Sequence, residues 1–264
     1  MHTDAASDRT PSPEWYGARS DLRDGTAGPD AGRERNVLLR SIPAESYARL
    51  APHLEPMQLE PKFVIWEPHA PIEWVYFPRT CVLSLLVPLA EDKPVEAATV
   101  GCEGFAGVPV VLDAGSAASR CIAQVPGESM RLRASVLREA AEEDRVLRRA
   151  LLRYAQALYE QTSQSVACNS RHDINERCAR WLLMTHDRVG GAEFRLTHEF
   201  LAMMMGVRRA SVTVAEGMLQ QAGLIRVSRG RVAVVDRVGL EASCCECYRI
   251  VKDRYDRLLN GGPS

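Results

Sequence analysis

The chain has 264 residues, enough for about two domains with cores of their own. Hydrophobic residues make up 46% and charged residues 25%, which excludes an intrinsically disordered chain. A net charge of −1 argues against a protein that coats nucleic acid through overall positive charge. The longest apolar runs, such as residues 81–89, are too short for the ~20 residues that span a bilayer. With no secretory signal visible, we expect a cytoplasmic protein whose eight cysteines stay reduced.

The first 33 residues are rich in Asp, Arg, Gly, Pro and Ser and contain no continuous apolar segment. We expect residues 1–33 to form a disordered arm. Residues 36–54 then show helical spacing that Pro43 and Pro52 interrupt, which predicts two short helices.

From about residue 57 to residue 133 the pattern changes to short apolar runs separated by proline and glycine. Such spacing is typical of an antiparallel sandwich or barrel, and we assign residues 34–145 to one β domain. The predicted strands cover residues 63–66, 72–77, 81–87, 95–100, 108–112, 120–125 and 129–133.

A long helix is expected over residues 146–168. One stripe recurs at alternating steps of four and three residues, a period that suits a seam between two helices. We predict that this helix joins two subunits, while packing of the same helix on its own β domain stays open as the alternative. The stripe consists of Leu147, Leu151, Tyr154, Leu158, Gln161 and Ser165, and the first four are the predicted dimer contacts.

Residues 169–264 have the pattern of a helical domain with a hairpin. A helix is expected over residues 174–189, ended by two glycines, and a last helix over residues 238–259. Between them, Thr197 is suited to cap a helix, and Ala202 precedes Gly206 by four residues. A small residue allows two helices to cross closely, and glycine accepts the positive φ of a tight turn. This arrangement predicts a helix-turn-helix.

The second helix of this motif, residues 208–221, should bury Val212, Ala215 and Leu219 and expose Glu216 and Gln220 on a polar face. A short basic hairpin follows at residues 224–235, which predicts a wing. Residues 195–237 contain seven arginines and three acidic residues, so positive charge is concentrated where DNA would bind. The candidate DNA contacts are Thr197, Arg208, Arg209, Ser211, Thr213, Arg229 and Arg231.

The segment LTHEFLAMMMGVRRASVTVAEGMLQQAGLIRVSRGRVAVVD resembles the DNA-binding domain of the Crp/Fnr family, named for the cyclic-AMP receptor protein and the fumarate–nitrate regulator. The resemblance implies an α+β fold with an N-terminal antiparallel, jelly-roll-like β-roll, a long dimerisation helix and a C-terminal winged helix-turn-helix. It also implies a homodimeric transcription regulator on partly palindromic double-stranded DNA, with RNA polymerase as a further partner of an activator. Arg209 matches the family's base-reading arginine, whereas Ala210 and Val214 stand where the family often has Glu and Arg.

The β-roll of this family can bind a cyclic nucleotide between a Gly-Glu element and an Arg-Ser/Thr element. The matching residues are Glu103 and Gly104, followed by Ser119 and Arg120 in the reverse order. Reversal places the cation on the opposite face of a strand, because successive side chains alternate. Three interpretations stay open: a cyclic nucleotide, another effector, and a β-roll that serves only as a scaffold.

We assign no metal site and no catalytic residues. Cys244, Cys245 and Cys247 are close in sequence, but a helix with incidental thiols is the simpler interpretation, with metal or redox sensing as the alternative. His172 and His186 have no second ligand at metal-binding spacing. No hydrolase, phosphate-loop or dinucleotide motif occurs, so we expect no enzyme. The rival to a DNA-binding regulator is a sensor or scaffold that acts through protein partners.

Overall fold

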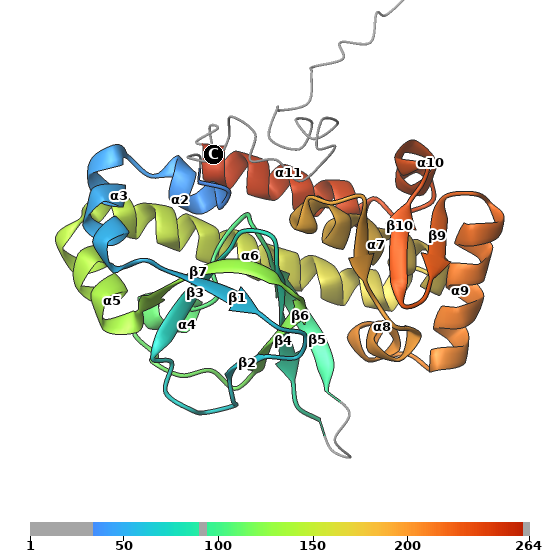
Figure 1. The fold of residues 1–264 in the computed structure, drawn as a ribbon, viewed down its shortest axis with the longest axis horizontal. Coiled ribbons are helices and arrows are strands. Elements are labelled where there is room, and N and C mark those ends of the chain that lie inside the picture. The colour runs from blue at the N-terminus through green and yellow to red at the C-terminus, as the bar shows by residue number, and fades with distance from the viewer. Residues whose placement is uncertain (1–33, 90–93, 261–264) are drawn as a thin grey trace, which may run out of the picture. The chain divides into compact units, whose positions relative to one another are not determined.

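A β-roll, two long helices and a winged helix-turn-helix follow one another in the computed structural model, which describes residues 34–89 and 94–260 (Figure 1). The predicted arm at residues 1–33 lies outside the described residues. Within the described ranges, no helix is long and apolar enough to cross a membrane. This order of elements confirms the predicted α+β architecture.

Two antiparallel sheets build the β-roll, as the punctuated apolar runs predicted. The first has the order β1 (Glu55–Leu59), β7 (Gly127–Arg133), β3 (Trp74–Pro78). The second has the order β2 (Val64–Trp66), β6 (Arg120–Val125), β4 (Val82–Val87), β5 (Val95–Val100).

Short helices open the β-roll and interrupt it. The chain enters through α2 (Val37–Ser41), α3 (Ala44–Leu50) and a 3-10 turn (Ala51–His53), which confirms the two short helices expected there. The strand predicted at residues 108–112 is wrong, because these residues form α4 (Val108–Val111). A proline in the first turn suits a helix start, and an apolar run this short does not distinguish strand from helix.

The long helix predicted at residues 146–168 is α6 (Arg145–Arg171), which Asp144 separates from α5 (Ala134–Glu143). Its apolar stripe faces the chain's own core. Packing of the helix on its own β domain therefore describes these side chains better than a seam between subunits. Each of the predicted dimer contacts is at most 8% exposed, and none is available to a second subunit in this structure; they are Leu147, Leu151, Tyr154 and Leu158.

A row of aromatic rings links the β-roll to the helices. Phe77 stacks on Phe105 at 5.6 Å between ring centroids, and Phe105 lies 5.2 Å from Tyr154 of α6. Tyr154 in turn lies 6.2 Å from Tyr255 of α11 (Cys247–Asn260). A Cβ at Gly104 would be 1.7 Å from the Tyr154 ring, so only glycine permits α6 to approach this loop.

The helix expected at residues 174–189 is α7 (Ile174–Val189), opened by an Asp173 capping box and closed by Gly190 at φ 68°. The single final helix predicted from residue 238 to residue 259 is wrong. It is divided into α10 (Arg237–Ala242) and α11, with a break at residues 243–246. Neither glycine nor proline marks this break; instead it turns the thiols of Cys245 and Cys247 inward, where both are buried with Cys168 of α6.

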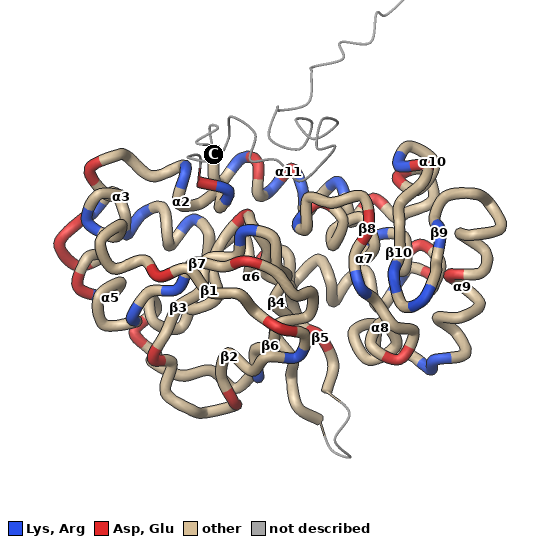
Figure 2. The backbone as a smooth tube through the Cα atoms, viewed as in Figure 1, with Lys and Arg blue, Asp and Glu red and all other residues tan. Residues whose placement is uncertain are grey.

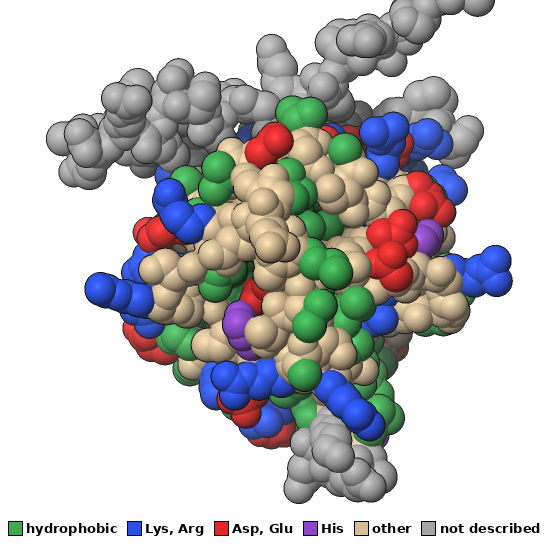
Figure 3. All heavy atoms as spheres, turned by 90° about the vertical axis from the view of Figure 1, so that its right-hand side faces the viewer, with side chains coloured by type: hydrophobic (Ala, Val, Ile, Leu, Met, Phe, Trp, Pro, Cys, Tyr) green, Lys and Arg blue, Asp and Glu red, His purple; other side chains and the backbone are tan. Residues whose placement is uncertain are grey.

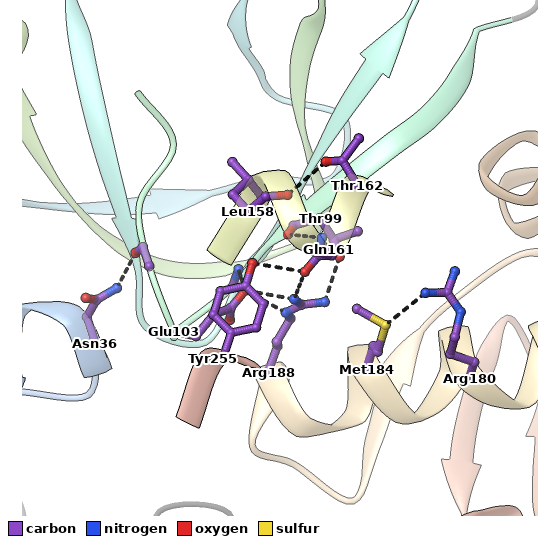
Figure 4. Close-up of polar contacts among 12 residues, drawn as sticks. Asn36, Thr99, Glu103, Leu158, Gln161, Thr162, Arg180, Met184, Arg188 and Tyr255 are labelled. Atoms are coloured by element: carbon purple, nitrogen blue, oxygen red, sulfur yellow. Dashed lines mark hydrogen bonds and ion pairs between the residues drawn. The ribbon is translucent and has the colours of Figure 1, made fainter. Parts of the chain in front are cut away.

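One buried guanidinium holds α6, α7, α11 and the β-roll together (Figure 4). Arg188 at the end of α7 donates to the Glu103 carboxylate at 2.9 Å, to the Thr99 hydroxyl at 2.6 Å and to the side-chain amide oxygen of Gln161 at 2.9 Å. The Tyr255 hydroxyl donates to the same Gln161 oxygen at 3.0 Å. Arg188 and Glu103 are 5% and 3% exposed, so this ion pair lies away from water.

We predict that Arg188→Met lowers the free energy of unfolding by about 3–5 kcal/mol, because it leaves the Glu103 carboxylate buried without its cation. Arg120→Met is the control: Arg120 pairs with Glu67 at 2.8 Å, but both side chains are about half exposed, and surface pairs contribute about 0–1 kcal/mol. Urea unfolding of both variants measures the difference. Equal losses in the two variants would contradict the structural role of the Arg188 cluster.

Candidate nucleic-acid interface

The helix-turn-helix consists of α8 (His198–Met205) and α9 (Arg209–Gln221). The Thr197 hydroxyl accepts a hydrogen bond from the Phe200 backbone N–H at 3.2 Å, which confirms its expected capping role. Gly206 has φ 64°, the left-handed conformation that the tight turn requires, and its N–H bonds back to the Ala202 and Met203 carbonyls. The turn therefore forms from the residues that the sequence indicated.

Helix α9 lies against the other helices of the domain through Val212, Ala215 and Leu219, each at most 5% exposed. Burial of this stripe turns the opposite face outward. Arg208 lies just before the helix as its N-cap residue, and Arg209 is its first residue. Both arginines are exposed, whereas Ser211 is half-buried.

The outward face of α9 has little charge beyond its first turn. Ala210, Val214 and Gly217 are exposed, and the Thr213 hydroxyl bonds to the Arg209 carbonyl at 3.1 Å and lies 3.2 Å from His198 Nδ1. Figure 3 shows this end of the molecule with its Lys and Arg side chains mostly near the edges, hydrophobic side chains across the middle and a group of acidic side chains to the right. The surface therefore combines peripheral cations with a neutral strip.

The predicted wing is a two-residue hairpin between β9 (Ile225–Ser228) and β10 (Arg231–Val234), with β8 (Glu193–Arg195) on the other side of β10. Arg229 and Gly230 at its tip have φ 49° and 72°. Positive φ at both central residues is the mark of a type I′ turn, whose twist matches that of the strands. The turn leaves Arg229 exposed, and Figure 2 shows the positive charge of this loop.

Two of the seven arginines of residues 195–237 form ion pairs within the protein. Arg231 forms an exposed ion pair with Glu193 on the neighbouring strand. Arg237 is structural: it bonds to Asp187 at 2.6 Å, to Glu241 at 2.8 Å and to the Tyr248 hydroxyl at 2.7 Å. The other five arginines of residues 195–237 are exposed; they are Arg195, Arg208, Arg209, Arg226 and Arg229.

Glu216 departs from the predicted polar face. The structure buries it at 2% exposure, with one carboxylate oxygen in close contact with His198 Nε2 on α8. Burial raises the pKa of the Glu216 carboxyl from 4.5 to about 7. Glu216 therefore joins the two helices of the motif and is not presented to a ligand.

The four residues predicted for an effector are engaged in different places. Glu103 is bound by Arg188, and Gly104 makes room for the Tyr154 ring. Arg120 pairs with Glu67 near the surface, and the Ser119 carbonyl accepts from the Trp66 indole at 2.9 Å. In this structure these groups contribute to docking of the helices and to the sheet edge.

The DNA-binding domain, α7 included, also contacts the β-roll directly, which the sequence did not indicate. The Trp181 indole of α7 donates to Glu96 of β5 at 3.1 Å, and the Ser84 hydroxyl of β4 bonds to the same carboxylate at 2.7 Å. A Cβ built on Gly206 would lie 3.5 Å from a methyl group of Val95. The motif's turn is therefore close to β5.

The burial of Glu216 predicts a pH dependence of stability. Between pH 4.5 and about 7 the folded protein keeps a proton that the unfolded chain releases, so stability falls as pH rises through this window. We expect Glu216→Gln to unfold like wild type near pH 4.5 and to be about 1–3 kcal/mol more stable near pH 8. Denaturant unfolding from pH 4.5 to 8 measures this, with Glu199→Gln on exposed α8 surface as the control. If the free energies of unfolding of wild type and Glu216→Gln changed in parallel with pH, the prediction would be contradicted.

Comparison with known proteins agrees with this geometry. Residues 176–243 match the Crp-like helix-turn-helix domain family. FixK2 from Bradyrhizobium japonicum is 16% identical with a TM-score of 0.60, over 73% of this chain and 98% of that one. A CRP-family transcriptional regulator from Thermus thermophilus is 18% identical with a TM-score of 0.58, over 71% of this chain and 95% of that one.

A third structure, the c-di-GMP responsive global regulator CLP of Xanthomonas campestris, is 15% identical with a TM-score of 0.57, over 73% of this chain and 99% of that one. No curated protein matches the chain by sequence. Identities this low establish the fold, and the match over residues 176–243 identifies the DNA-binding motif. The chain thus has the fold of the Crp/Fnr transcriptional regulators and contains a Crp-like helix-turn-helix domain.

Proposed function

We propose that this protein regulates transcription as a homodimer whose two winged helix-turn-helix domains bind a partly palindromic DNA site. The observation that carries the proposal is the placement of Arg209 at the start of α9, exposed beside the turn of a Crp-like motif. The N-terminal residues of a recognition helix are the ones that reach base edges in the major groove. DNA binding places the protein in the compartment that holds the DNA, the cytoplasm for a regulator of bacterial type.

Specific readout would come from the first turns of α9. The Arg209 guanidinium can donate two hydrogen bonds to one guanine. Ala210 and Val214, one turn apart and both exposed, offer apolar contacts of the kind that thymine methyl groups make. Arg229 at the wing tip supplies a phosphate contact without sequence preference. The expected half-site therefore combines one guanine with neighbouring thymines.

A homodimer needs a surface on α6 other than the buried stripe. The helix exposes a second row at steps of four, three, four and three residues, which suits a two-helix seam. Its apolar members Leu152, Tyr159 and Val166 are 38%, 67% and 65% exposed. The complete row is Leu152, Gln156, Tyr159, Ser163 and Val166.

Control by an effector would act through the contacts between the β-roll and the DNA-binding domain. Thr99 and Glu103 of the β-roll bind Arg188, and Glu96 binds Trp181. A ligand that changes these contacts biases the orientation of the two recognition helices. Only a separation near ~34 Å lets both enter successive major grooves.

We predict that Arg209→Ala weakens binding to the selected site by about 1–3 kcal/mol and relaxes the preference at one base pair. The comparison is Arg229→Asn, in which asparagine tolerates the left-handed turn while the charge is removed. This variant should weaken binding to all sequences alike and reduce the salt slope by about 1.

Fluorescence anisotropy at several salt concentrations, with the selected site and its single-base variants, separates the two effects. Equal weakening of every sequence by Arg209→Ala would make Arg209 a phosphate contact and contradict its role in base reading.

We predict that Tyr159→Glu shifts the protein from dimer toward monomer, because it places a charge in the middle of the exposed seam. Leu112→Glu is the matched control, since Leu112 is 58% exposed but lies in the β-roll. Analytical ultracentrifugation measures both. A dimer that survives Tyr159→Glu with unchanged affinity would place the subunit interface elsewhere.

A further inference from the structure

Three cysteines and one histidine from distant parts of the sequence meet beside the end of α6. They are Cys168 and His172 at the end of that helix, Cys245 in the break that precedes α11, and Cys247 as the first residue of α11. One ligand atom from each residue lies within 4.8 Å of the other three. Three thiols and an imidazole are the ligand set of a Cys₃His zinc site.

Two separations within the cluster match those around a single tetrahedral ion, and the others are at most 4.8 Å. Cys168 Sγ lies 3.6 Å from Cys245 Sγ, and Cys247 Sγ lies 3.5 Å from His172 Nδ1. With Zn–S bonds of ~2.3 Å and Zn–N bonds of ~2.0–2.1 Å, tetrahedral ligand atoms lie about 3.5–3.8 Å apart. An iron–sulfur cluster attaches its thiolates to different irons and spreads the ligand atoms further.

Neighbouring side chains hold His172 and Cys247 in orientations that suit metal ligands. Nδ1 of His172 faces the thiols, and its Nε2 lies 3.2 Å from the Glu246 carboxylate. A carboxylate on the far nitrogen of a ligating histidine fixes the ring and its tautomer. The Gln164 side chain donates to Cys247 Sγ at 3.0 Å, an interaction that stabilises a thiolate.

These three thiols are more deeply buried than the neighbouring thiol of Cys244. Cys168, Cys245 and Cys247 are at most 3% exposed and form a cluster of their own. Cys244, next in sequence, is half-buried, and its Sγ bonds to the Glu241 carbonyl at 3.2 Å. The distance of 3.6 Å between Cys168 and Cys245 also exceeds the ~2.05 Å of a disulfide.

We propose that Cys168, His172, Cys245 and Cys247 bind one Zn²⁺ ion in a closed tetrahedral site. The ion would connect the start of α11 to the junction between α6 and α7, because His172 is the C-cap residue of α6 and Asp173 is the N-cap residue of α7. Closed sites with four protein ligands stabilise structure and leave no position for a reacting water. The zinc would thus hold the C-terminal helix at the hinge between the long helix and the DNA-binding domain.

The test measures zinc in the full chain, purified without chelators or metal-affinity steps, by inductively coupled plasma mass spectrometry. We expect about one zinc ion per chain in wild type. Cys247→Ser and His172→Gln should weaken zinc binding by more than about a hundredfold, since even removing a hydrogen-bond partner of a ligand costs ~10–100-fold. Cys244→Ser is the matched control and should keep its zinc.

Cobalt replacement in the wild-type chain gives a readout that does not depend on how the variants fold. Co²⁺ in this site should show the absorption of a tetrahedral ion and charge-transfer bands from its thiolates. Absence of both zinc and cobalt from wild type would overturn the proposal, as would a disulfide between Cys168 and Cys245 in the fresh protein. Equal zinc loss in Cys244→Ser and Cys247→Ser would overturn it as well.

Discussion

The buried charge of Arg188 is the constraint on which the arrangement of the molecule depends. A guanidinium removed from water must find a counter-charge and acceptors, and here they come from the β-roll and from α6. Gly101 allows the Arg188 side chain to approach the β-roll closely, since a Cβ at this position would lie 2.4 Å from that side chain. Because every partner is needed at once, the DNA-binding domain has one favoured position against the β-roll.

Short-range patterns allowed much of the DNA-binding motif to be predicted. Thr197, Gly206 and the buried stripe of α9 obey local rules of capping, turn conformation and helical period, and the structure confirms them. Long-range packing was beyond the sequence. The stripe on α6 has the period of a seam between subunits, yet the β-roll and α11 cover it; periodicity identifies an apolar face but not its partner. Cys245, Cys247 and His172 could be named from the sequence, but their grouping with Cys168 could not, since 77 positions separate Cys168 from Cys245 in the chain.

The proposed DNA surface combines exposed arginines with a largely neutral recognition face. Arginines at the wing tip and at the start of α9 supply long-range attraction, although the chain as a whole is slightly acidic. If α9 reads DNA as proposed, the neutral strip formed by Ala210, Val214 and Gly217 would give it a readout distinct from the Glu- and Arg-rich helix that the family resemblance suggests. The contact between half-buried His198 and buried Glu216 joins α9 to α8 behind this face.

The most direct test of the account is selection of DNA fragments by the purified full-length protein, followed by sequencing of the bound fraction. We predict enrichment of one partly palindromic motif whose half-sites lie about one helical turn, ~10–10.5 base pairs, apart. Each half-site should contain the guanine assigned to Arg209. Bound fragments that share no motif, or a motif without two-fold symmetry, would contradict a homodimeric sequence-specific regulator.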